Sequence, residues 1–158
     1  MLKIIDQSVF LELFLWAVIM VLSLNKNKLV IKNVFVGLKS KGFSPVINES
    51  GFITLPINGS TYLVLVDDTD DGYLQIILPA FYFEGTGTRD NQEKILFAAN
   101  FANIESKLAR CYCIDGRVST SVDVLVSSVS QFVDDFKRYV SALDYCRSRF
   151  VSALNRKA

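Results

Sequence analysis

Short runs of apolar residues, rich in β-branched and aromatic side chains, follow one another through the middle of the chain, and such runs between turn residues are typical of strands. The runs are residues 51–57, 62–66 and 73–83. Asn58 and Gly59 connect the first two runs, and an Asn-Gly pair is a strong hairpin signal because both residues accept positive φ. Residues 67–72 (DDTDDG) form the next turn. The sequence therefore predicts a three-stranded antiparallel meander, whose last strand is ended or bulged at Pro79.

A second hairpin is predicted further along the chain. Residues 110–114 and 118–126 are strand-like, and Asp115-Gly116 between them is again a favoured turn pair. Together with the meander, this hairpin gives an antiparallel sheet of about five strands, arranged as three plus two.

Residues 28–42 show the 3.6-residue period of an amphipathic helix. Ile31, Val34, Phe35 and Leu38 have the i, i+3, i+4, i+7 spacing of one apolar face, and Gly42 is a plausible stop. The β-branched residues of this segment leave a strand open as the alternative. We expect a helix.

A further helix is expected to start at Asp90. Asp90 as the N-cap and Glu93 three residues later resemble a capping box. The expected apolar face consists of Ile95, Leu96, Ala99, Ala102 and Leu108.

The last helix is predicted over residues 129–154, with Ser128 and Gln131 as a second capping box. Its stripe keeps the helical period throughout, which predicts one long packed face. The stripe consists of Val129, Phe132, Val133, Phe136, Val140, Leu143, Cys146, Phe150 and Leu154.

Residues 9–24 are apolar except for Glu12 and Ser23, and a helix that is apolar all round is either buried or in a membrane. Such a helix rises about 24 Å, which is short of the roughly 30 Å hydrocarbon core, and Glu12 is costly in lipid. Residues 1–27 are therefore expected to form an apolar N-terminal helix that packs in the core, forms a dimer or anchors the chain in a membrane. A cleaved signal is the remaining alternative.

Length and charge restrict the class of protein further. The 158 residues correspond to about one domain, so we expect a single α+β domain over residues 28–158. The net charge of +1 gives no electrostatic reason to expect nucleic acid as a partner. Cys111, Cys113 and Cys146 form an odd, sparse set without C-x-x-C spacing, which favours small packing residues in a reducing compartment.

The sequence gives little evidence for a catalytic site. The chain has no histidine, which excludes Ser-His-Asp and Cys-His nucleophile systems and histidine zinc sites. The Asp67 run has Leu78 where a calcium loop needs its closing glutamate, and residues 85–89 (GTGTR) lack the phosphate-loop pattern. Asp134 and Asp135 are adjacent and point apart on a helix. We therefore expect no catalytic, cofactor or metal site; an enzyme with an unrecognised carboxylate site stays as an alternative.

The aromatic run Phe81-Tyr82-Phe83 is the best candidate for a partner-binding site. Neighbouring residues on a strand face opposite sides, so Phe81 and Phe83 are expected in the core and Tyr82 on the surface. An antiparallel sheet of this kind can accept an apolar segment of a partner.

The predicted order of elements and several motifs resemble the YbjN-like family, whose fold is similar to that of type III secretion chaperones. The likeness covers residues 28–154, in the order α-βββ-α-ββ-α. It is carried by Gly42-Phe43, Gly51-Phe52, the strand YLVLV of residues 62–66, Gly72-Tyr-Leu-Gln75, the segment Phe97-Ala-Ala-Asn100-Phe-Ala-Asn103, the hairpin Asp115-Gly116-Arg117-Val118 and the last helix. Residues 9–24 and the near-neutral charge depart from secretion chaperones.

The resemblance implies a bacterial, non-enzymatic and often dimeric protein with a chaperone-like or regulatory role. We therefore expect a cytoplasmic module that binds a protein or peptide, as a homodimer. The first alternative is a module anchored through residues 9–24 in the inner membrane and facing the cytoplasm.

Overall fold

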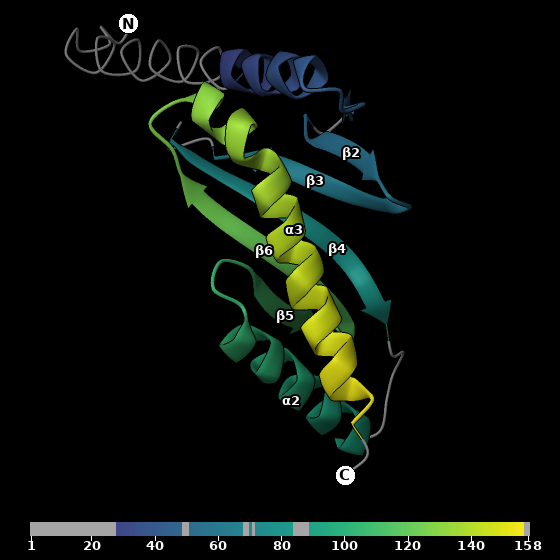
Figure 1. Ribbon diagram of the computed structural model, residues 1–158. Coiled ribbons are helices and arrows are strands. Elements are labelled where there is room, and N and C mark those ends of the chain that lie inside the picture. Colours follow the sequence, from purple (N-terminus) through teal and green to yellow (C-terminus); the bar gives the residue numbers. More distant parts are fainter. Residues whose placement is uncertain (1–27, 49–50, 68–69, 71, 84–88, 157–158) are drawn as a thin grey trace, which may run out of the picture.

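The computed structural model describes residues 28–48, 51–67, 70, 72–83 and 89–156 (Figure 1). The apolar helix expected within residues 1–27, and its packing, dimer or anchor role, lie outside these described residues. Among the residues that the structure describes, no helix is both long enough and apolar enough to cross a lipid bilayer.

The protein is an α+β protein built on a six-stranded antiparallel sheet with the order β1-β2-β3-β4-β6-β5. The strands are β1 (Val46–Ile47), β2 (Ile53–Ile57), β3 (Ser60–Val66), β4 (Tyr73–Phe83), β5 (Arg110–Ile114) and β6 (Arg117–Leu125). The expected meander and hairpin are both present, and pairing of β4 with β6 joins them into one sheet.

The count of five strands was wrong by one, because β1 has two residues and is too short to show a period. Val46 of β1 pairs with Thr54 of β2, and the Thr54 hydroxyl donates a hydrogen bond to the Val46 carbonyl oxygen at 3.1 Å. This contact with β2 holds β1 at the edge of the sheet.

The two hairpin turns adopt the backbone that their sequences predict. Asn58 and Gly59 have φ of 49° and 77°, and Asp115 and Gly116 have φ of 49° and 72°. Positive φ at both central residues matches the right-handed twist of the flanking strands, so these turns set the register of both hairpins.

Strand β4 is bulged where Pro79 predicts it. The register against β6 shifts between Leu78 and Tyr82, Ala80 has a φ of 44°, and the Ala80 N–H donates to the Ser119 hydroxyl at 2.9 Å. A bulge turns the side chains that follow it away from simple alternation. It therefore changes where the aromatic run lies.

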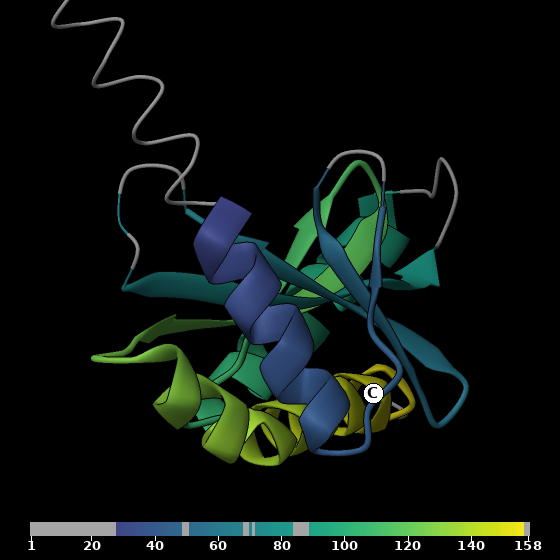
Figure 2. The same ribbon diagram turned by 90° about the horizontal axis from the view of Figure 1, so that it is seen from above.

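Two long helices, α2 (Arg89–Glu105) and α3 (Val129–Leu154), pack against one face of the sheet (Figures 1 and 2). Residues 28–40 are also helical, as expected, and bury Val34 and Leu38 in the same core. This helix crosses closely over α3, since a Cβ added to Gly37 would lie 2.6 Å from Val133 Cγ2. The chain then turns at Gly42, which has a φ of 85°.

Helix α2 differs from its prediction at both ends. It starts at Arg89, so Asp90 lies in the first turn rather than at the N-cap, and Glu93 bonds to the Arg89 side chain at 3.1 Å. Leu108 lies beyond the last residue of the helix, Glu105, and Leu96 is 59% exposed instead of buried.

Helix α3 follows its prediction closely. Ser128 is the N-cap, and its hydroxyl accepts the Gln131 N–H at 3.2 Å; the Gln131 side chain accepts from Ser127, one residue earlier than a capping box requires. Most of the predicted stripe is buried. The buried residues are Phe132, Val133, Phe136, Tyr139, Val140, Leu143, Cys146, Phe150 and Ala153.

Candidate partner-binding surface

Helix α2 carries apolar side chains on two sides. The inner side, packed in the core, consists of Ile95, Ala98, Ala99 and Ala102. The outer side consists of Phe97, Phe101 and Ile104, whose spacings of four and three residues place them on one face. We call Phe97, Phe101 and Ile104 the outer stripe.

The outer stripe holds larger side chains than the buried face. Phe97 is 61% exposed and Ile104 is 82% exposed, while Phe101 is half-buried. Burying a side chain of this size contributes about 1.5–3 kcal/mol, which the isolated chain does not gain at Phe97 and Ile104. Contiguous exposed apolar side chains mark sites of interaction more often than chance surface.

The outer stripe borders a seam between α2 and α3, which run side by side at the C-terminal end of the chain (Figure 1). A first hollow of about 700 Å³ lies at one end, between Lys94 and Phe97 of α2 and Leu154 of α3. A second hollow of about 640 Å³ lies at the other end, between Leu108 and Tyr145.

Arginine side chains lie over the middle of the seam. The Arg156 guanidinium is 4.2 Å from the centre of the Phe101 ring, and that of Arg149 is 5.4 Å from it. Arg149 also pairs with Glu105 at 3.3 Å. Stacking of a guanidinium on an aromatic face is favourable and leaves its N–H groups available at the surface.

The predicted site Phe81-Tyr82-Phe83 lies elsewhere. Phe81 and Tyr82 are both half-buried, and both rings pack against the buried Phe150 of α3 with centroids 5.5 Å apart. The expectation that these neighbours face opposite sides was wrong, because the bulge at Ala80 breaks the alternation. Phe83 lies opposite Arg117 of β6 in the backbone register, and its side chain is outside the described part.

The face of the sheet turned away from α2 and α3 is a second surface with apolar residues. Leu63, Leu65 and Ile77 are half-buried there, beside a polar group in which Asp123 accepts hydrogen bonds from Tyr73 at 2.8 Å and Gln75 at 2.6 Å. This face therefore combines apolar and hydrogen-bonded positions, whereas Phe97 and Ile104 at the two ends of the outer stripe are more exposed.

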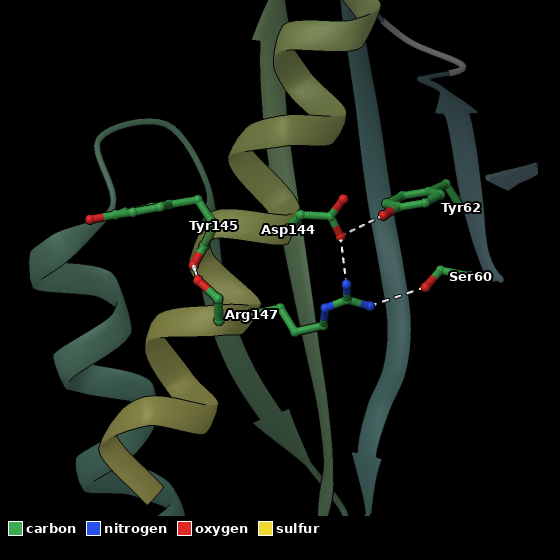
Figure 3. Close-up of polar contacts among 6 residues, drawn as sticks. Ser60, Tyr62, Asp144, Tyr145 and Arg147 are labelled. Atoms are coloured by element: carbon green, nitrogen blue, oxygen red, sulfur yellow. Dashed lines mark hydrogen bonds and ion pairs between the residues drawn. The ribbon is translucent and has the colours of Figure 1, made fainter. Parts of the chain in front are cut away.

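A polar cluster connects α3 to β3 (Figure 3). The Tyr62 phenol donates to Asp144 Oδ1 at 2.7 Å, and Arg147 pairs with the same oxygen at 3.0 Å and donates to the Ser60 hydroxyl at 3.0 Å. Burial, and then the hydrogen bond to Asp144, raise the pKa of Tyr62 far above its usual range. The phenol therefore stays protonated, and the cluster is suited to holding the helix rather than to transferring protons.

Two of the three thiols meet inside the protein. Cys111 of β5 and Cys146 of α3 are both buried, as packing residues. Interaction with the Cys111 thiol lowers the pKa of Cys146, and interaction with Cys146, together with burial, raises the pKa of Cys111. Cys113 is half-buried.

The carboxylates considered above as metal or catalytic groups form hydrogen bonds and ion pairs with neighbouring residues. Asp67 and Asp70 accept the N–H groups of Asp70 and Gly72, which closes the turn. Asp134 pairs with Lys41 at 2.7 Å on the surface. Within the described ranges, no three acidic, cysteine or histidine side chains come together as a metal site.

No known protein-family model matches the chain, and no curated protein matches it. The YbjN-like resemblance therefore stays a prediction that rests on the sequence motifs and the order of elements. The outer stripe was not predicted from the sequence, although the helical spacing of Phe97, Phe101 and Ile104 is present there. The periodicity was assigned to one face of α2, while this helix has two.

Proposed function

We propose that this protein is a non-enzymatic module that binds a segment of another polypeptide against the outer stripe of α2. The proposal rests mainly on the unusual distribution of side chains on α2. Small alanines face the core, while the larger Phe97 and Ile104 face solvent. A partner that covers these side chains gains the burial energy that the isolated chain lacks.

The two hollows support the same surface. Each adjoins the seam between α2 and α3, and together they provide places for apolar side chains of a bound segment. A helix lying in such a groove, with anchors at i, i+3, i+4 and i+7, is a common mode of peptide recognition. The predicted order α-βββ-α-ββ-α, to which the structure adds the short strand β1, and the resemblance to the YbjN-like family add a chaperone-like or regulatory role, a bacterial source, a cytoplasmic location and a homodimer to the proposal.

The proposal is tested by selecting peptides from a random library on the full chain and measuring their affinity by fluorescence anisotropy. We expect Ile104→Ser to weaken binding about tenfold or more, because one buried aliphatic side chain is lost. Val36→Ser is the matched control, since Val36 is a β-branched residue on another helix and is 56% exposed.

Tyr82→Ala tests the aromatic run on β4 as the competing site. If Tyr82→Ala abolishes binding while Ile104→Ser leaves it unchanged, the outer stripe is not the binding surface. Light scattering on the same samples gives the oligomeric state, and a dimer that is lost in Ile104→Ser would show that a second copy covers the stripe.

A further inference from the structure

We propose that the partner segment is an amphipathic helix with an acidic polar face, lying along the seam between α2 and α3. This inference rests on the proposed function and adds the chemistry of the partner. The acidic character of the partner is inferred from the charged side chains around the two hollows, because the apolar outer stripe says nothing about the partner's polar face.

The charged side chains at the seam are predominantly basic once ion pairs are taken into account. Glu93 pairs with Arg89, and Glu105 pairs with Arg149. Asp90 is then the carboxylate that lines the first hollow without a salt bridge among the described residues. The corresponding cations, exposed and without a salt bridge in the same part of the chain, are Lys94, Lys107, Arg138 and Arg156.

These cations are distributed at both ends of the apolar stripe. Lys94 and Arg156 line the first hollow, and Lys107 and Arg138 line the second. The rise along α2 from Phe97, at the first hollow, to its last residue, Glu105, at the second hollow, is about 12 Å, or just over two helical turns. A partner helix of that length can contact both hollows with apolar side chains and direct carboxylates at the cations on either side.

Arg156 contributes to both the apolar and the charged part of the proposed recognition. Its guanidinium carbon lies over the Phe101 ring, 4.2 Å from the ring centre, so the side chain is already positioned when the partner arrives. A preoriented guanidinium binds a carboxylate in a forked geometry at a smaller entropic cost than a free lysine.

The charges are expected to set the choice of partner, while apolar contacts supply most of the affinity. Exposed ion pairs are individually weak and are screened by salt, with a Debye length of about 10 Å at 0.1 M. The preference for an acidic partner should therefore be strong at low salt and diminish at high salt.

The test uses the full chain and two helical peptides of about 18 residues, which are some 27 Å long. Both have the same leucine stripe; one has glutamate and the other glutamine on the polar face. At low salt we expect the glutamate peptide to bind about tenfold tighter, and this advantage to fall in 0.5 M NaCl. Arg138→Glu combined with Lys107→Glu should remove the advantage. Lys32→Glu combined with Lys39→Glu, on the helix of residues 28–40, is the control.

The outcomes separate this inference from the proposed function. Equal binding of both peptides, lost in Ile104→Ser, overturns the acidic partner and leaves the binding surface intact. Binding of neither peptide by a folded chain, together with failure of the library selection, overturns both. A single-stranded oligonucleotide that binds the seam more tightly than the glutamate peptide would also overturn the acidic polypeptide as partner.

Discussion

At the scale of single residues, buried polar groups hold the layers of the protein together. Tyr62 is 1% exposed and donates to Asp144, so its phenol connects β3 to the middle of α3 (Figure 3). A hydrogen bond to a charged acceptor contributes more than a neutral one. The cluster therefore fixes the position of α3, and with it one wall of the seam.

Tyr62→Phe should lower the free energy of unfolding by about 1–2 kcal/mol at pH 8, because the hydrogen bond to Asp144 is lost. The raised pKa of Tyr62 means that the unfolded state ionises above about pH 10 while the folded state keeps its proton. The unfolded state then binds fewer protons, so this stabilisation is lost as the pH rises.

Urea unfolding of wild type and Tyr62→Phe at pH 8 and pH 10.5 measures both effects. We expect the difference in the free energy of unfolding between wild type and Tyr62→Phe to be smaller at pH 10.5 than at pH 8. Tyr73→Phe, which removes an exposed phenol bound to Asp123, is the control and should change stability little at pH 8. A difference that stays constant with pH would contradict the assigned role of the Tyr62 proton.

At the scale of elements, α2 both covers the edge strand β5 and carries the outer stripe. The Asn103 carboxamide accepts the Cys111 N–H at 2.6 Å and donates to the Cys111 carbonyl oxygen at 2.9 Å. It therefore pairs with β5 as a neighbouring strand would, which satisfies and blocks this edge. This contact also fixes the rotation of α2, so that Phe97 and Ile104 face away from the sheet.

Asn103→Ala should lower the free energy of unfolding by about 2–4 kcal/mol, since the backbone N–H and carbonyl of Cys111 both lose their partner. Asn100→Ala, at an exposed position of the same helix, should be neutral or slightly stabilising because alanine is the better helix former. Chemical denaturation of both variants measures these changes in the free energy of unfolding. Similar effects at the two positions would show that the contact with β5 is unimportant.

Much of the element structure could be predicted from the sequence. The Asn58-Gly59 and Asp115-Gly116 turns depend on local backbone preference, and the stripe of α3 repeats over seven turns, so both signals are strong. Strand β1 has too few residues for a period, and its pairing with β2 is a tertiary contact. Pro79 indicated a bulge, but the sequence does not say how far the bulge rotates Phe81 and Tyr82.

The binding surface was harder to predict than the fold. Leu96 and Phe97 are adjacent, and periodicity alone does not tell which apolar residues of α2 face the core. The answer depends on the Asn103 contact with β5 and on the packing of α2 against α3, with small side chains such as Ala98 buried in the core. Both are decided only when the distant strand and helix are in place.

At the scale of the whole molecule, α2 and α3 pack on one face of the sheet and form a seam where they run side by side (Figure 1). Within the described part of the chain, two surfaces are considered as candidates for a partner: the seam with the outer stripe, and the opposite face of the sheet with Leu63 and Ile77. The central claim is that a partner polypeptide binds the first of these.

Hydrogen exchange of the full chain, measured by mass spectrometry with and without the selected peptide, tests this claim most directly. We predict slower exchange in residues 89–109 and 138–156, and unchanged exchange in residues 60–66 and 73–78. The claim is contradicted if the bound peptide protects these strands and leaves both helical segments unchanged.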